Sequence, residues 1–407
     1  MKITDKATRF GFYYTMSDVL FGGVPLLLVP IVAYYLLPGE FALYSNLVVL
    51  MAVSSVFIDF GSAGYYGVIF HKKKVIKNLV YFDSILIISI NTLLLLVVVS
   101  FFIDNIVNIV KVSEIHIYIS IMTAFFMCIN SLYLTKLRFN EAVFSFVLLR
   151  LAQVFIHAAL TIALVILYDF SWIGRYLSHF IPIALLFIWV LWQGLSVVKS
   201  NKLRFSLKRV IPHLLFGVNL LPHAFSSWIK TSLDRFFLSD LPDLISNGVY
   251  SMAFQISMIV ALVGIGFNKA FAPEIFKRIA ANNGINGFIK KITFYNLLFT
   301  LLTTVFFLIY GDKILPDSYN GVAEVLPYLL IGQGMLNIYI VYSNIIFYFE
   351  SVLFLSLISV FSAIVHVLIL INYVPVYYEI GAGMAFFISS FIQLMLTVVY
   401  VKTKFNY

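Results

Sequence analysis

Residues 228–276 have the sequence WIKTSLDRFFLSDLPDLISNGVYSMAFQISMIVALVGIGFNKAFAPEIF. Three charged side chains, Lys230, Asp234 and Arg235, occur there in a run that is otherwise mostly aliphatic and aromatic. Moving a charge from water into an apolar layer costs free energy unless the charge finds a partner. Charges retained in such a run therefore indicate pairing or ligand binding. The run itself indicates a chain that lies within a membrane.

The composition of the whole chain agrees with a membrane protein. Of its 407 residues, 62% are hydrophobic and 11% are charged, whereas soluble domains are about half apolar and a quarter charged. The single cysteine, Cys128, excludes an internal disulfide and a thiolate metal cluster. The net charge of +9 lies in short loops between apolar runs, so it predicts membrane topology and not a nucleic-acid partner.

Transmembrane helices are expected wherever about 20 apolar residues can cross the roughly 30 Å hydrocarbon layer. The chain has twelve such runs: 17–37, 42–66, 79–102, 115–135, 142–167, 172–194, 211–237, 246–268, 290–310, 322–349, 352–373 and 378–401. We therefore predict an all-α integral membrane protein of twelve transmembrane helices.

Loop charges and loop lengths predict the topology. Most of the 27 Lys and Arg residues fall in alternate loops, and cytoplasmic loops carry the basic residues, so both termini are expected in the cytoplasm. We predict an N-terminal six-helix lobe over 1–197, a cytoplasmic linker over 198–209 and a C-terminal six-helix lobe over 210–407. A faint repeat supports this division: GEFALYSNLVVLMAVSSVFIDFG follows span one, and NGVYSMAFQISMIVALVGIG follows span seven.

Motifs of cofactor chemistry are missing from the sequence. It contains no G-x-x-x-x-G-K-[ST], no H-E-x-x-H, no paired cysteines and no Gly-rich dinucleotide turn. We therefore expect that the protein is not an enzyme and that it binds no metal and no cofactor. Uphill transport would then depend on a substrate or ion gradient, with H⁺ or Na⁺ as the possible coupling ion.

The seventh predicted span carries the charged run. His223, Lys230 and Asp234 follow the spacing i, i+7, i+11, which places them on one helical stripe, with Arg235 one residue further round. In one interpretation Lys230 and Arg235 extend to the outer interface and Asp234 pairs with one of them. In the interpretation we favour, His223, Lys230 and Arg235 line a cavity that binds an anionic substrate.

The fifth predicted span has a second polar stripe, formed by Arg150, Gln153, His157 and Thr161. Arg150 alone can reach the cytoplasmic face, but four polar groups in one row favour a helix that faces the protein interior. A guanidinium is a planar donor that matches phosphate oxygens. We therefore predict that Arg150, Gln153 and His157 bind substrate.

For other polar residues within or near the spans, the sequence gives weaker evidence of a functional role. Gln333 and Asn337, with Asn344, form a row in span ten that suits sugar binding or interhelical hydrogen bonding. We expect Arg175 and His179 to anchor their helix near the outer membrane surface, and we expect His366 to be a hydrogen-bonded histidine in the packed interior. For Asp18, Asp59 and Asp234 we consider ion coupling or gating, with helix capping or ion pairing as the alternative.

The charged run and its neighbours resemble a known family. KTSLDRFFL, NGVYS and FAPEIFK resemble the second-half opening of the Wzx-type polysaccharide flippases, in the multidrug/oligosaccharidyl-lipid/polysaccharide exporter superfamily. In that family an Asp-Arg pair ends span seven, a Gly-x-Tyr opens span eight and a Pro follows. The matching positions here are Asp234-Arg235, Gly248-Val249-Tyr250 and Pro273. LLPGEFALY at 36–44 resembles the exit of span one, with Ala42 where Gly is usual.

The resemblance implies a V-shaped, MATE-like bundle of two six-helix lobes that alternates between inward-open and outward-open states. Its implied substrate is an undecaprenyl-pyrophosphate-linked oligosaccharide, moved across the bacterial inner membrane for O-antigen (lipopolysaccharide), capsule or exopolysaccharide assembly. Implied partners are membrane lipids, a polysaccharide polymerase and a chain-length regulator.

Four alternatives stand beside this interpretation. Three are a drug or cation antiporter of the same superfamily, a lipid II flippase, whose branch typically has fourteen spans, and the polysaccharide polymerase, an enzyme of the same pathways. The fourth, a structural or scaffolding membrane protein, leaves the interior polar stripes unexplained.

Overall fold

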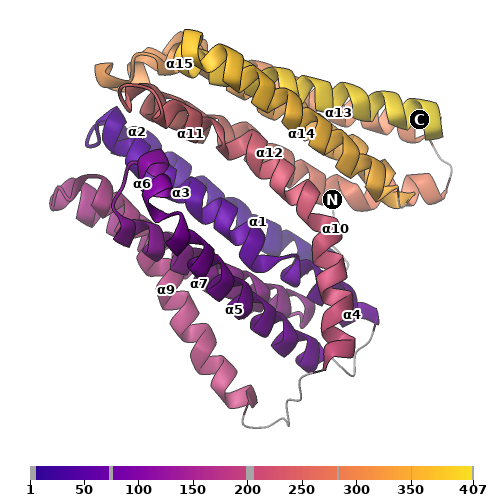
Figure 1. Ribbon diagram of the computed structural model, residues 1–407. Helices are drawn as coiled ribbons and strands as arrows, with labels where there is room; N and C mark the ends of the chain where they lie inside the picture. The colour runs from indigo at the N-terminus through magenta and orange to yellow at the C-terminus, as the bar shows by residue number, and fades with distance from the viewer. Residues whose placement is uncertain (1–5, 73–76, 199–205, 282–283, 350, 406–407) are drawn as a thin grey trace. The chain divides into compact units, whose positions relative to one another are not determined.

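The computed structural model describes residues 6–72, 77–198, 206–281, 284–349 and 351–405, and all regular secondary structure in these residues is helical (Figure 1). The helices are α1 (Lys6–Leu27), α2 (Val29–Ala33), α3 (Pro38–Asp59), α4 (Ser62–Lys72), α5 (Lys77–Phe101), α6 (Ile103–Val110), α7 (Glu114–Phe139), α8 (Val143–Thr161), the π-helix η2 (Ile162–Leu167), α9 (Ser171–Val198), α10 (Leu207–Ser232), α11 (Asp234–Ser239), α12 (Ile245–Ala280), α13 (Ile285–Ile314), the 3₁₀-helix η3 (Asp317–Tyr319), α14 (Val322–Tyr348) and α15 (Val352–Phe405).

The helices agree with the twelve predicted spans. Among the described residues, ten helices are long and apolar enough to cross a membrane. One of them, α15, is broken at Tyr378, whose backbone is non-helical with φ 49°. Its two parts correspond to two predicted spans. The remaining predicted span, 211–237, corresponds to α10 and α11, where Pro212, Pro222 and several charges interrupt the apolar run. The prediction of an all-α membrane protein is confirmed.

The chain divides into two compact units. Unit 1 comprises residues 1–25 and 43–225, and unit 2 comprises residues 26–42 and 226–407. The early segment 26–42 therefore packs within the unit that is otherwise built from the second half of the chain. The linker predicted at 198–209 lies largely outside the described residues, which omit 199–205, so that boundary stays a prediction.

Unit 1 is arranged around α7, which contacts α4, α5, α8 and α9. More than half of its spanning segment is buried, against 22% for α8 and 28% for α5. The outward residues of α5, such as Leu93, Leu94 and Val97, are exposed and apolar, as a lipid-facing surface requires.

A sharp break separates α3 from α4. Phe60 and Gly61 have left-handed backbones with φ 46° and 74°, a conformation that glycine adopts without steric cost. The Asp59 carboxylate accepts a 3.4 Å hydrogen bond from the Ala63 N–H at the start of α4. The apolar segment predicted over 42–66 is therefore two helices.

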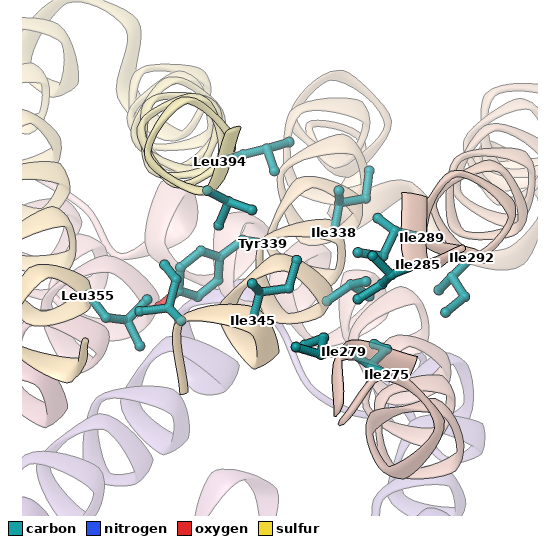
Figure 2. Close-up of a cluster of buried hydrophobic side chains, with 13 residues drawn as sticks. Ile275, Ile279, Ile285, Ile289, Ile292, Ile338, Tyr339, Ile345, Leu355 and Leu394 are labelled. Carbon is teal, nitrogen blue, oxygen red and sulfur yellow. The ribbon is translucent and has the colours of Figure 1, made fainter. Parts of the chain in front are cut away.

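Unit 2 is arranged around α14, which contacts α12, α13 and α15 (Figure 1). A cluster of buried side chains joins these four helices (Figure 2). Ile275 and Ile279 come from α12, Ile285 and Ile289 from α13, and Ile345 from α14. Branched side chains have few rotamers to lose, so this cluster holds one end of the four helices in a defined packing.

Residues 26–42 pack closely on the start of α12. The Tyr319 hydroxyl donates a 2.9 Å hydrogen bond to the Leu36 carbonyl. Gly248 lies directly against the Pro38 carbonyl, where a Cβ atom would collide with the backbone. The two stretches that carried the family resemblance, 36–44 and 247–251, therefore touch each other through Pro38 and Gly248. Glycine is required at position 248 by this close approach.

Replacement of Gly248 by Ala is expected to destabilise unit 2, because the added methyl group must displace the Pro38 backbone. A cost of about 1–3 kcal/mol is typical for overpacking. The measurement is the thermal unfolding midpoint of purified protein in detergent.

Gly266→Ala is the matched control, since Gly266 lies in the same helix with no neighbouring atom within 4 Å of an added Cβ. It should be neutral or slightly stabilising, because Ala favours a helix by about 1 kcal/mol over Gly. Equal midpoints for the two variants would contradict the assigned contact.

Candidate functional site

The charged run of the seventh span lies inside unit 2. Helix α10 ends at Ser232 and the chain turns at Leu233 before α11 begins. Lys230, Asp234 and Arg235 are only 3%, 0% and 6% exposed. Burial at this level excludes the interpretation in which Lys230 extends to the surface in this conformation. The contacts of the three charges are instead with side chains of α12 and α15 and with the end of α10.

Lys230 is held by α15. Its Nζ donates to Oε1 of Gln393, and Gln393 Nε2 donates in turn to Ser359 Oγ at 3.3 Å. Ser359 and Gln393 lie on either side of the Tyr378 break, so Lys230 connects to both parts of α15. The partner of the ammonium group is a neutral amide, which forms a weaker hydrogen bond than an anion would.

Arg235 is held by α12 and by the end of α10. Its guanidinium donates to the Thr231 carbonyl and lies 4.2 Å from the centre of the Phe254 ring. The Tyr250 ring is 5.4 Å away. Aromatic faces attract a guanidinium, and Asn247 Nδ2 fixes the backbone by donating to the Arg235 carbonyl at 3.1 Å. Tyr250 and Asn247 belong to the stretch that resembles the flippase family.

Asp234 faces a histidine. Its carboxylate Oδ1 lies 3.0 Å from His366 Nε2, and both side chains are fully buried. The other ring nitrogen, Nδ1, is 3.2 Å from Ser389 Oγ, and that hydroxyl is also 3.1 Å from the Phe386 carbonyl. A serine hydroxyl has one hydrogen and can donate to only one of these two acceptors.

The contact between Asp234 and His366 is a close approach of an acidic and a basic side chain. His366 Nε2 and both Asp234 carboxylate oxygens have no hydrogen-bond partner among the described residues, so the 3.0 Å contact is an ion pair by distance and not a hydrogen bond. Chains of Asp and His inside membrane proteins form proton relays. The pair therefore has the residue types of a proton-binding site.

His366→Leu is expected to destabilise unit 2 by about 3–5 kcal/mol, because it leaves the buried Asp234 carboxylate without its partner. Ser389→Ala removes one hydrogen bond and should cost about 1 kcal/mol. Chemical denaturation in micelles measures both. An Asp234→Asn change added to His366→Leu should recover part of the loss, and a His366→Leu cost as small as that of Ser389→Ala would refute the pairing.

A second buried cation lies in unit 1, at a residue that the sequence suggested as an outer anchor. Arg175 is 1% exposed. Its Nη1 donates to Thr161 Oγ1 at 2.8 Å and to His157 Nε2 at 3.1 Å, and its guanidinium lies 5.3 Å from the Tyr44 ring. Because a guanidinium only donates, His157 must present its Nε2 lone pair. No acidic side chain pairs with Arg175 within the described part of the chain.

Arg150 belongs to a different group on the same helix. It lies 3.5 Å from Asp18, and Asp18 also pairs with Arg138 at 3.2 Å. The Arg150 guanidinium covers the Phe21 ring at 4.1 Å. Gln153 is buried, and its Oε1 has no hydrogen-bond partner among the described residues. The polar stripe predicted on the fifth span is therefore two groups, one at Asp18 and one at Arg175.

Asp59 lines a hollow of about 340 Å³ in unit 1, between α3, α7 and α10. Its carboxylate also faces the start of α4, as the capping alternative predicted. His223 is half-buried on α10 and falls in unit 1, whereas Lys230 and Asp234 fall in unit 2. The three residues of the predicted stripe are thus divided between the units.

An ion pair connects α10 to α5 in unit 1. Arg209 Nε and Nη2 donate to the Asp83 carboxylate at 2.7 and 3.2 Å. These hydrogen bonds raise the pKa of the Arg209 guanidinium, so it stays charged. The two residues of this ion pair are 126 positions apart in the sequence.

The polar row of span ten connects helices. Asn337 Nδ2 donates to the Val260 carbonyl at 2.8 Å, and its side chain fills the space that Gly264 leaves open. Gln333 Nε2 lies 3.7 Å from the Met258 sulfur. These contacts between α14 and α12 are those of the interhelical alternative. No group of three His, Cys, Asp or Glu side chains among the described residues is arranged to hold a metal ion.

Sequence reasoning missed the partners of the charged run. His366 lies in the first part of α15, and Ser389 and Gln393 lie in the second part, beyond the break at Tyr378. Their spacing in the sequence therefore gave no signal. Arg175 was missed because its position near the start of a span suggested the interface. Serine, glutamine and histidine inside an apolar run are the signal that could have been used.

The same fold occurs in solved membrane transporters. The structure titled "Lipid II flippase MurJ, inward closed conformation" matches with a TM-score of 0.73 at 16% identity, over 97% of this chain and 86% of that one. An inward-facing multidrug resistance MATE family transporter matches with a TM-score of 0.64 at 12% identity, over 97% and 95%. The fold is therefore that of these transport proteins, and the chain is a multi-pass membrane protein.

The family follows from the sequence match. The family described as "Polysaccharide biosynthesis protein" matches residues 8–277, and the chain belongs to it. The family expected from the motifs is thus confirmed. A curated relative, "Lsg locus putative protein 1" of Haemophilus influenzae, is 25% identical over 174 residues. That match spans 41% of this chain and 43% of the relative, so the chain aligns with less than half of its length.

Proposed function

We propose that the chain is a flippase for undecaprenyl-pyrophosphate-linked oligosaccharide repeat units. It would move them from the cytoplasmic to the outer leaflet of a bacterial inner membrane for O-antigen, capsule or exopolysaccharide assembly. The family description and the transporter fold support this proposal. The alternation of basic loops supports cytoplasmic termini.

The observation that carries the proposal is the excess of buried positive charge. Lys230, Arg235 and Arg175 are all buried, while the buried acids in the described residues are Asp234 and Asp83, and Asp83 is already paired with Arg209. Each cation costs about 2.5–3.5 kcal/mol at the centre of a bilayer. An anionic headgroup such as a pyrophosphate offsets this cost when it binds.

All three cations donate to neutral acceptors, which a phosphate oxygen could replace. Lys230 donates to an amide, Arg235 to a backbone carbonyl, and Arg175 to a hydroxyl and an imidazole. Hydrogen bonds to an ionised oxygen are roughly twice as strong as those to neutral acceptors. We assign headgroup binding first to Lys230, with Arg235 beside it. Arg150, Gln153, His157, His223, Gln333 and Asn337 remain further proposed contacts of the substrate.

The proposed ion-coupling group is the Asp234–His366 pair, because it places a buried carboxylate 3.0 Å from a buried imidazole, the residue types of proton relays in membrane proteins. Proton binding there would add a positive charge four residues along the chain from Lys230. Thermodynamic linkage then requires that an anion bound at Lys230 and a proton bound at the pair favour each other. Asp18 and Asp59 remain candidates for gating in unit 1.

A drug or cation antiporter is the second candidate, because multidrug MATE transporters share the fold. An organic cation calls for unpaired acidic groups inside the membrane. The buried acids of the described residues are instead paired, Asp83 with Arg209 and Asp234 with His366. The charge balance therefore favours an anionic substrate.

Lys230→Gln is expected to reduce flipping of the lipid-linked repeat unit by roughly ten- to a hundredfold, because a charge-assisted hydrogen bond contributes about 1.5–3 kcal/mol. Lys230→Arg should retain more activity, since it keeps the charge. The measurement is the fraction of repeat units left on the cytoplasmic side of the membrane, normalised to the amount of protein in the membrane.

Lys313→Gln removes an exposed lysine and is the matched control. It should leave repeat-unit distribution unchanged. Normal polysaccharide output from a triple variant with Arg150, Lys230 and Arg235 replaced by Ala would refute the headgroup assignment. A deletion that altered only drug sensitivity would favour the antiporter instead.

A further inference from the structure

A hollow separate from the buried charges lies in unit 2, where α12 ends and α13 begins. Its volume is about 590 Å³, within the range of small-molecule sites. Arg278 on α12 and Lys291 on α13 provide positive charge on its two walls. Phe271, Phe288 and Tyr295 provide aromatic surface.

The two cations retain free hydrogen-bond donors. Arg278 uses its Nε for Glu274 at 2.8 Å and stacks over the Phe288 ring at 4.5 Å. Its Nη groups have no partner among the described residues. Lys291 lies 5.9 Å from the Tyr295 ring and has no hydrogen bond or ion pair within the described part of the chain. Phe288 therefore orients the Arg278 guanidinium, whose outer edge can bind phosphate oxygens in the planar mode typical of arginine.

The start of α13 adds donors on the same side. Gly284 precedes the helix with φ 56°, and no side chain caps the first turn. Gly287, in that turn, has no atom within 4 Å of an added Cβ. Both glycines line the hollow. A helix start with uncapped N–H groups attracts an anion, and here it adds to the charges of Arg278 and Lys291.

The floor of the hollow is apolar. Ile292 belongs to the buried cluster drawn in Figure 2. Phe271 and Phe288 pack against that cluster. A free phosphate ion has nothing to place on such a floor. The glycerol and first acyl carbons of a phospholipid do, and their burial is favourable.

The position of the hollow suits a lipid. The two candidate spanning helices Ile245–Ala280 and Ile285–Gly311 meet there, so the hollow lies at one end of a helical hairpin. Basic residues gather around this turn, where basic pockets between transmembrane helices bind anionic headgroups. They are Lys269, Lys277, Arg278, Lys290 and Lys291. We propose that this hollow binds the phosphate headgroup of an anionic phospholipid between Arg278 and Lys291.

Native mass spectrometry of the full chain in micelles tests the proposal, with an equimolar mixture of phosphatidylglycerol and phosphatidylcholine as probe. The wild type should retain phosphatidylglycerol in preference. Lys291→Gln should weaken that retention about fivefold, and Arg278→Gln should weaken it by a similar factor. Lys290→Gln is the matched control, because this exposed neighbour carries the same charge outside the hollow.

Three outcomes would overturn the proposal. If Lys290→Gln and Lys291→Gln weakened phosphatidylglycerol retention equally, the retention would be due to general surface charge and not to the hollow. Equal retention of both lipids by the wild type would remove the headgroup preference. Displacement of phosphatidylglycerol by an equal concentration of inorganic phosphate would assign the hollow to a small soluble anion. If the Arg278→Gln chain fails to fold, Lys291→Gln alone decides, since the Lys291 side chain is exposed.

Discussion

Charges enclosed in a membrane protein have no bulk water to stabilise them, and this constraint determines the interior of both units. In unit 2, Lys230 meets Gln393 and Asp234 meets His366, so α10 and α11 are tied to α15 by polar contacts. In unit 1, Arg175 draws His157 and Thr161 of α8 towards α9. Each cation has a neutral hydrogen-bond acceptor, which keeps the fold intact and leaves the charge available to a stronger partner.

The sequence predicted the fold well because the hydrocarbon layer imposes a length and a polarity on each span. It also predicted that Lys230, Asp234 and Arg235 would be paired or would bind a ligand, because charges in an apolar run are costly wherever they lie. The partners could not be predicted. His366 and Gln393 are 132 and 159 residues beyond Asp234 in the chain, and only the packing of α15 brings them near. Stripes drawn on a single helix also failed to show that Arg150 and His157 belong to different groups.

The motifs that indicate the family have a structural explanation in unit 2. Asn247 fixes the backbone of Arg235, Tyr250 lies beside its guanidinium, and Gly248 admits the Pro38 carbonyl. These residues hold α11, α12 and the segment 26–42 together. Much of the sequence signature therefore describes how the charged run is held in place.

The placement of residues 26–42 has a consequence for biosynthesis. The hydrogen bond from Tyr319 to the Leu36 carbonyl joins residues 283 positions apart. At 5–20 residues per second, the ribosome needs roughly 15–60 s between making the two. During that interval residues 43–225 of unit 1 emerge while residues 26–42 still lack their final neighbours in unit 2. Unit 2 is thus begun before unit 1 is complete and is finished last, and a stalled or truncated nascent chain leaves an early segment unmatched in the membrane, where quality-control proteases can recognise it.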